Sequence, residues 1–272
     1  MELIAILLSS VLAFAANAGW FIEHAIFNAF RSRFQEVEQL EVRVDNKPNS
    51  QIFQGHIDGI FIASRGVKPI PNLRIEALEL ETDPIEIDLK NFRKQGISAF
   101  QESLKKPLNG GIRLVVTETD INQALQSEAI ITRIEEVINK LRGNSSRKYE
   151  LLNPQIDLLG DNRLKIMLQL RRSQETEPLN INLELGLTVV DGTRIEIIEP
   201  MGTVNGRQLS SRVLNGLAER IGSRLDLRKL EETGTIARIL QLDGTQDLLQ
   251  GAAIFRLPNV MPVETSRLNV ST

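Results

Sequence analysis

The sequence predicts an α+β fold in which a long, curved antiparallel β-sheet wraps around one or two long amphipathic helices, with an apolar helix at the amino terminus. Three observations support this prediction. Several segments alternate apolar and polar residues and are separated by short turns, which is typical of antiparallel strands. Two later segments carry apolar residues at helical spacing, and the first segment of the chain is almost continuously apolar.

The amino-terminal segment 1–34 begins with an apolar run from Leu3 to Ala16, and Ala16-Asn17-Ala18 has the small-x-small form of a signal-peptidase site. Glu2 stands where a signal peptide carries positive charge. The run is also shorter than the roughly 20 apolar residues of a membrane-spanning helix. A cleaved signal peptide, a retained anchor or interfacial helix, and a buried helix are therefore three open alternatives. As an anchor, the segment contacts the membrane through Leu3, Ile4, Leu7, Leu8, Leu12, Trp20 and Phe21.

Short strands are expected in the first half of the chain. Leu40, Val42 and Val44 share one face of the first strand. In the segment 73–82 the apolar residues move from odd to even positions, which predicts a bulge near Ala77. Thr119 then resembles a helix N-cap and begins a helix that continues to about residue 141.

The second half repeats this order, with strands expected at 149–159, 163–172, 178–190 and 194–200, a helix at 208–226 and a final hairpin ending at residue 257. The clearest strand runs from Leu179 to Val189, where apolar and polar residues alternate without interruption. Its length is about 36 Å at roughly 3.3 Å per residue. Residues 35–258 are expected to form one domain, followed by a loose tail at 259–272.

Composition excludes several kinds of chemistry. The chain has no cysteine and only two histidines, which excludes a thiol nucleophile, a disulfide framework and a histidine-rich zinc site. Net charge is −3 and aromatic residues make up 4%, so nothing favours binding of nucleic acid. The sequence contains no phosphate-binding loop, nucleophile elbow or dinucleotide glycine motif. We therefore expect neither a cofactor, a resident metal nor enzymatic activity.

The remaining polar candidates are weak. His56 has no partner nearby in the sequence and is interpreted as a surface or half-buried residue. Six carboxylates alternate with apolar residues on expected strands, which indicates a solvated face, with a weak calcium site near Asp83 and Glu86 as the alternative. The six are Glu76, Glu79, Glu81, Asp83, Glu86 and Asp88.

Two stretches carry a resemblance to a known family. The first is the segment 40–48, followed by Gln54-Gly55 and the segment 78–85, and the second is the segment 114–125. Together they resemble the LmeA-like phospholipid-binding family of bacterial envelope proteins. The resemblance implies export, phospholipid binding and a fold similar to tubular lipid-binding proteins, in which a curved sheet wraps a long helix beside an apolar channel. It implies no catalytic residues.

The sequence and the resemblance together predict a non-enzymatic protein of the cell envelope that either only binds phospholipid or binds and transfers it. The membrane is contacted through the amino-terminal segment, and a protein partner is not identified. The expected lipid-binding residues are Leu164, Ile166, Leu168, Leu170, Leu183, Leu185 and Leu187. The alternative is a non-catalytic envelope scaffold or interaction protein in which the chain's own helices fill this space, and an enzyme acting on lipid or glycan is a third hypothesis.

Overall fold

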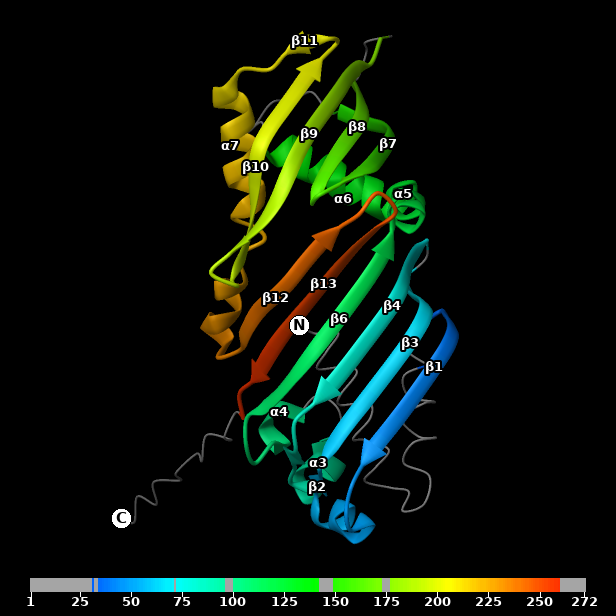
Figure 1. The fold of residues 1–272 in the computed structure, drawn as a ribbon, viewed down its shortest axis with the longest axis vertical. Coiled ribbons are helices and arrows are strands. Elements are labelled where there is room, and N and C mark those ends of the chain that lie inside the picture. The colour runs from blue at the N-terminus through cyan, green and yellow to red at the C-terminus, as the bar shows by residue number, and fades with distance from the viewer. Residues whose placement is uncertain are drawn as a thin grey trace, which may run out of the picture.

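The computed structural model describes residues 31, 34–70, 72–95, 100–141, 149–172 and 177–259. The predicted amino-terminal helix, with all the membrane-anchoring residues from Leu3 to Phe21, lies outside the described residues. So does the predicted tail, apart from residue 259. Within the described residues the strands pair antiparallel and the helices are few, which agrees with the predicted α+β class (Figure 1).

The first main sheet has six strands and contains most of the core. Val42, Ile62, Leu80 and Ile112 form one directly paired row across four of these strands. Ile62 is completely buried, and each such aliphatic side chain contributes about 1.5–3 kcal/mol of burial free energy. In spatial order the strands are β1 (Glu36–Asp45), β3 (Gly59–Ile70), β4 (Leu73–Thr82), β6 (Leu108–Thr117), β13 (Leu248–Leu257) and β12 (Ile236–Gly244).

Short elements close one end of this sheet (Figure 1). Phe92 and Phe100 come from two short helices and are almost completely buried in the same core. Gly55 has a φ of 84°, and a Cβ there would lie 2.1 Å from the carbonyl oxygen of Ile87, so this close approach requires glycine. The elements are η1 (Asn49–Gln54), the paired strands β2 (His56–Ile57) and β5 (Ile85–Glu86), α3 (Leu89–Gln95) and α4 (Phe100–Ser103).

The second main sheet has five strands and contains the long alternating strand. Its hairpin turns fall at Asp161-Asn162 and Asp191-Gly192, as predicted, and all four residues have positive φ. In spatial order the strands are β11 (Arg207–Gln208), β10 (Arg194–Val204), β9 (Leu179–Val190), β8 (Arg163–Arg172) and β7 (Tyr149–Gly160). The accompanying helices are α5 (Glu118–Leu125), α6 (Glu128–Leu141), α7 (Ser211–Gly222) and the 3₁₀ helix η3 (Leu227–Thr233).

Three details differ from the sequence predictions. The strands form two main sheets and a two-stranded one, not a single continuous sheet. The helix expected from Thr119 to residue 141 is broken into α5 and α6, and its N-cap is Thr117, whose hydroxyl accepts the Asp120 N–H at 3.1 Å. The β3–β4 register is continuous through Ala77, and its irregularity lies between Val67 and Ile70, closer to the turn.

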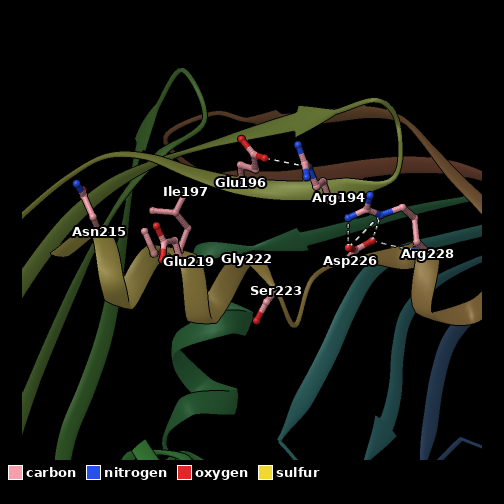
Figure 2. A pocket seen from close by; sticks show the side chains of 10 residues that line it. Arg194, Glu196, Ile197, Asn215, Glu219, Gly222, Ser223, Asp226 and Arg228 are labelled. Carbon is pink, nitrogen blue, oxygen red and sulfur yellow. Dashed lines mark hydrogen bonds and ion pairs between the residues drawn. The ribbon is translucent and has the colours of Figure 1, made fainter. Parts of the chain in front are cut away.

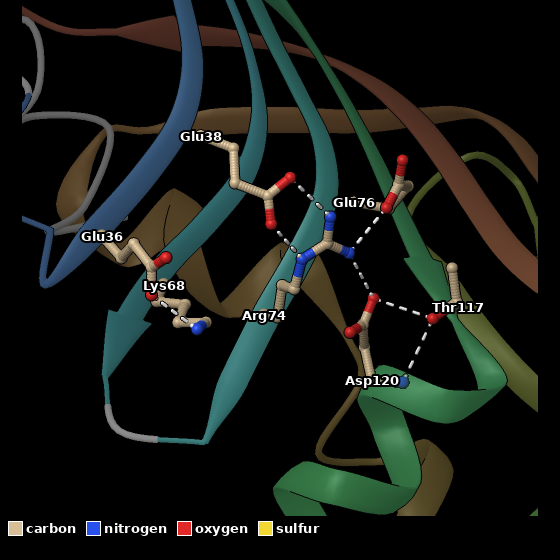
Figure 3. A network of polar contacts seen from close by, with 7 residues as sticks. All are labelled: Glu36, Glu38, Lys68, Arg74, Glu76, Thr117 and Asp120. Atoms are coloured by element: carbon tan, nitrogen blue, oxygen red, sulfur yellow. Dashed lines mark hydrogen bonds and ion pairs between the residues drawn. The ribbon is translucent and has the colours of Figure 1, made fainter.

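Helix α5 carries polar side chains that connect both main sheets. Toward the first sheet, Asp120 accepts a hydrogen bond from Arg74 at 3.1 Å and another from the Thr117 hydroxyl at 2.7 Å (Figure 3). Toward the second sheet, Asn122 and Glu118 bond to the backbone of β7. Side chains of α5 therefore bond to the outer edge of β7, whereas both edges of β6 are already paired, with β4 and with β13.

The Arg74 guanidinium has two further carboxylate partners (Figure 3). It donates to both oxygens of Glu38, at 2.9 and 3.1 Å, and to Glu76 at 2.6 Å. The hydrogen bonds from Arg74 hold the pKa of Glu38 below its usual value, and the hydrogen bonds to Glu38 and Glu76 raise the pKa of Arg74. Asp120 is the buried member of this network, with 7% of its side chain exposed.

A second connection joins hairpin turns of the five-stranded sheet to β12. The Ile239 N–H donates to the carbonyl of Gly192, in the β9–β10 turn, at 2.6 Å. Asn162, in the β7–β8 turn, accepts from the Gly244 N–H through its side chain and donates its own N–H to the Gly244 carbonyl. The two main sheets are thus held together at α5 and along β12.

Candidate functional site

The second sheet carries an aliphatic face formed by directly opposed residues of β8 and β9. Leu164 pairs with Leu185, and Ile166 pairs with Leu183. This aliphatic pairing continues into both neighbouring strands. Leu164 also lies opposite Leu158 of β7, and Leu187 lies opposite Ile197 of β10. The structure therefore places all seven predicted lipid-binding residues on one surface, here called the aliphatic face: Leu164, Ile166, Leu168, Leu170, Leu183, Leu185 and Leu187.

Burial is uneven across the aliphatic face. Leu170 and Leu185 are core residues, with 8% and 5% of their surface exposed. The other five members are only half-buried: Leu164, Ile166, Leu168, Leu183 and Leu187. Half-buried aliphatic side chains on a strand face still have apolar surface available to another molecule.

Two helices flank this face. Helix α6 packs Ile131, Ile134 and Ile138 against one end of it, in a cluster that includes Leu168 and Leu170. Helix α7 packs on β10, where Leu214 and Leu183 both approach Gly202 so closely that a Cβ on this glycine would lie 3.2 and 2.6 Å from their Cδ2 atoms. The other five members of the face belong to neither of the two hydrophobic clusters of the described core: buried Leu185 and the half-buried Leu164, Ile166, Leu183 and Leu187.

A polar pocket of about 480 Å³ lies beside the aliphatic face, between β10 and α7 (Figure 2). Ile197, which pairs with Leu187, is one of its walls. The charged side chains around it are two arginines and three carboxylates: Arg194, Arg228, Glu196, Glu219 and Asp226.

Ion pairs organise part of this pocket. Arg228 binds Asp226 through Nε and Nη2, with contacts of 2.6–3.1 Å. These side-chain bonds, helped by the Arg228 backbone N–H, lower the pKa of Asp226 to about 2. The Nε of Arg194 lies 2.9 Å from Glu196 but is not aligned for a hydrogen bond.

Sequence reasoning missed this pocket. Its residues come from a strand, a helix and the segment that follows the helix, so no motif of fixed spacing connects Arg194 with Glu219. The one local indication of the pocket in the sequence is the position of Asp226, two residues before Arg228. In the structure the Asp226 carboxylate accepts a hydrogen bond from the Arg228 backbone N–H at 3.0 Å.

The weaker polar candidates form ordinary ion pairs. His56 has a partner that the sequence analysis overlooked, since its Nε2 lies 3.0 Å from the Asp58 carboxylate. Glu79 pairs with Arg113, and Glu86 pairs with Lys106. Among the described residues, no three acidic or histidine side chains gather closely enough to hold a metal ion.

Comparison with known protein families gives a match over most of the chain. A model of the LmeA-like phospholipid-binding family matches residues 15–253, which covers both main sheets almost completely. No curated protein and no solved structure matches the chain. In the part of the chain that the structure describes, no helix has the length and apolar character required to cross a membrane. Because the family match extends over nearly the whole sequence, the chain belongs to the LmeA-like phospholipid-binding family.

Proposed function

We propose that the protein binds phospholipid without chemical conversion and that the acyl chains lie on the aliphatic face between α6 and α7. The observation that carries this proposal is the half-buried state of Leu164, Ile166, Leu183 and Leu187, which belong to neither described core cluster. Membership of a phospholipid-binding family supports the choice of ligand.

The energetics favour an acyl chain on this surface. Each CH₂ removed from water contributes about 0.8 kcal/mol. The part of β9 from Leu183 to Leu187 spans about 16 Å at roughly 3.3 Å per residue, which is comparable to the roughly 15 Å of one leaflet of a bilayer core. A single acyl chain therefore fits along the part of the aliphatic face that the described helices leave half-buried.

The proposal includes a location. We propose that the protein acts at the cell envelope, and that segment 1–34 contacts the membrane through its apolar residues or directs export. A fractionation experiment tests this: the full-length chain is expected with envelope membranes or in the periplasm. Recovery in the cytoplasmic fraction contradicts it.

Lipid binding is tested by mass spectrometry of lipids that co-purify with the protein and by uptake of a tail-labelled phospholipid from liposomes. The decisive variant is Ile166→Gln, and Met167→Gln is its matched control, because residue 167 faces the opposite side of the same strand. We expect Ile166→Gln to reduce uptake at least fivefold at an unchanged melting temperature, and Met167→Gln to retain uptake.

Two outcomes contradict the proposal. The first is a wild-type protein with neither co-purified lipid nor uptake. The second is a normally folded Ile166→Gln variant with wild-type uptake. If Ile166→Gln unfolds, Ile166→Ala and Leu187→Ala provide the same comparison with milder changes. Loss of stability in both without loss of uptake then supports the alternative function, an envelope scaffold whose aliphatic face is filled by its own side chains.

A further inference from the structure

We propose that β1 pairs antiparallel with β1 of a second copy of this chain, so that the six-stranded sheets of the two copies join across a two-fold axis. Strand β1 lies at one edge of the first main sheet, and among the described residues it pairs only with β3 (Figure 1). This inference concerns assembly and is independent of lipid binding.

The chain covers the other three edges of its two main sheets. Side chains of α5 bond to the β7 edge, and hairpin turns of the five-stranded sheet bond to the β12 edge. The β10 edge is bonded by β11 and by the Leu225 carbonyl, which accepts the Ile195 N–H at 3.3 Å. Within the described part of the chain, nothing except β3 bonds to the backbone of β1. An uncovered sheet edge is a place where another strand can add.

The direction of the backbone groups follows from β3. The Ile60 N–H donates to the Thr82 hydroxyl of β4 at 3.1 Å, so it points away from β1. Amide groups two residues apart in a strand point to the same side, so those of Ile62 and Ser64 also point to β4. The residues of β1 opposite these three therefore direct their own N–H and C=O groups to the free edge: Leu40, Val42 and Val44.

The side chains of β1 select one register for self-pairing. When Val42 lies opposite the partner's Val42, Leu40 lies opposite the partner's Val44, and all three outward-directed residues form hydrogen-bonded pairs. On the other face of the sheet, Glu41 then lies opposite the partner's Arg43, and the two-fold axis produces this pair twice. Sliding one strand by two residues instead places two copies of Glu41, or two copies of Arg43, directly opposite each other. Directly opposed unlike charges stabilise a strand pair and like charges destabilise it, so the first register is preferred.

The two charged residues are available for this contact. Glu41 is exposed and forms no ion pair with any described residue. The ion pair of Arg43 is with Asp45 at 3.4 Å, and both side chains are more than half exposed, at 57% and 64%, so the pair contributes little. The Arg43 guanidinium also lies 5.1 Å from the centre of the Phe61 ring, and stacking of this kind leaves its N–H donors free for a carboxylate.

The apolar face of β1 also has surface left to cover. Leu40, Val42 and Val44 pack against the main core cluster but are only half-buried. In the proposed register the same three side chains of the partner lie directly beside them. The second copy therefore extends the apolar face of the first sheet as well as its hydrogen bonding.

The first test is the oligomeric state of the full-length protein in a non-ionic detergent, measured by sedimentation velocity. We expect dimers that form with rising concentration over roughly two decades around the micromolar range. Glu41→Arg and Arg43→Glu each place like charges opposite each other and are expected to weaken dimerisation about tenfold. The double variant exchanges the two charges and is expected to restore dimerisation. Arg65→Glu is the matched control, because residue 65 is an exposed arginine of β3 away from the free edge.

The second test fixes the register. The chain has no cysteine, so Val42→Cys introduces a single thiol per copy. Residues of a hydrogen-bonded antiparallel pair have Cα atoms about 5.5 Å apart, which suits a disulfide, and mild oxidation is expected to give a covalent dimer. Glu36→Cys, at the end of β1, is the control and is expected to stay uncrosslinked.

Three outcomes overturn the proposal. The first is a wild-type protein that stays monomeric over the whole range, which is also expected if another segment of the same chain covers β1. The second is a dimer that neither single charge reversal weakens. The third is a covalent dimer that forms faster with Glu41→Cys than with Val42→Cys, because that result requires a different register.

Discussion

Asn122 of α5 and Ile156 of β7 exchange two hydrogen bonds. The Ile156 N–H donates to Oδ1 of Asn122 at 2.8 Å, and Nδ2 of Asn122 donates to the Ile156 carbonyl at 2.8 Å. The side-chain amide therefore satisfies the strand edge as a neighbouring strand would. Glu118 and Gln126 bond to the same edge, at Leu158 and Pro154, from positions one helical turn to either side of Asn122.

We expect Asn122→Ala to lower the free energy of unfolding by about 1–3 kcal/mol, because it leaves one N–H and one C=O of β7 without their partner. Urea denaturation measures this effect. Gln123→Ala is the matched control, since residue 123 is the next residue of α5 and is exposed. Equal losses in the two variants would show that the paired hydrogen bonds are unimportant.

Arg74→Leu removes the cation that contacts Glu38, Glu76 and Asp120 together. We expect a loss of about 2–4 kcal/mol in unfolding free energy, because buried Asp120 is left without its counter-charge. Arg65→Leu, at an exposed position of the neighbouring strand, is expected to change stability by less than about 0.5 kcal/mol. The pair is compared by chemical denaturation at neutral pH, and similar losses in both variants contradict the role assigned to Arg74.

The ion pair between Asp226 and Arg228 predicts a pH dependence. The hydrogen bonds from Arg228 hold the pKa of Asp226 at about 2 in the folded protein, below the value of 3.8 for an ordinary aspartate. A lowered pKa in the folded state stabilises the protein above the unfolded-state pKa, and this contribution disappears as the pH falls toward the folded-state pKa. The stability contribution of Asp226 is therefore complete above about pH 4 and is lost between about pH 4 and pH 2.

Asp226→Asn is accordingly expected to be less stable than the wild type at pH 7, with a difference that shrinks as the pH is lowered through this window. Unfolding free energies at a series of pH values measure the difference, and exposed Asp247→Asn serves as the control. A destabilisation of the same size at every pH would show that it does not come from the carboxylate charge.

Gly216→Ala is expected to stabilise the protein by about 0.5–1 kcal/mol. Gly216 lies inside α7, and a Cβ there meets no atom within 4 Å, so alanine gains helix propensity without a clash. Gly202→Ala is expected to have the opposite effect, because its Cβ would lie 2.6 Å from Cδ2 of Leu183 and 3.1 Å from the Asn182 carbonyl oxygen. Melting temperatures of the two variants should shift in opposite directions, and a shift of the same sign contradicts this account of α7 packing.

The sequence predicted the elements that depend on local pattern. Alternation identified the strands of the second sheet, and the Asp191-Gly192 hairpin turn lies where its residue types indicated. The hairpin turns set the register of the paired strands and therefore decide which residues lie directly opposite one another. This is why Leu164, Ile166, Leu183 and Leu185 share one face.

Long-range features were not predictable in the same way. The outer edge of β7 is satisfied by side chains of Asn122, Glu118 and Gln126, and such side-chain bonds leave no periodic pattern in the sequence. The pocket at Arg194 depends on how α7 lies along β10, which is set by packing at Gly202. The break between α5 and α6 falls at Ser127, whose hydroxyl donates to the Ala124 carbonyl at 2.7 Å, a local bond that competes with helix continuation.

The contacts of Gly192 and Asn162 with β12 have a consequence for assembly. An edge strand with free backbone groups is a template on which strands of other molecules can add, and β12 also carries exposed Leu240 and Ile236. Because hairpin turns of the same chain already bond to Ile239 and Gly244, an incoming strand would have to displace them before it could pair along the full length of β12. Variants that shorten either turn should therefore aggregate faster than the wild type, even where their folded stability is the same.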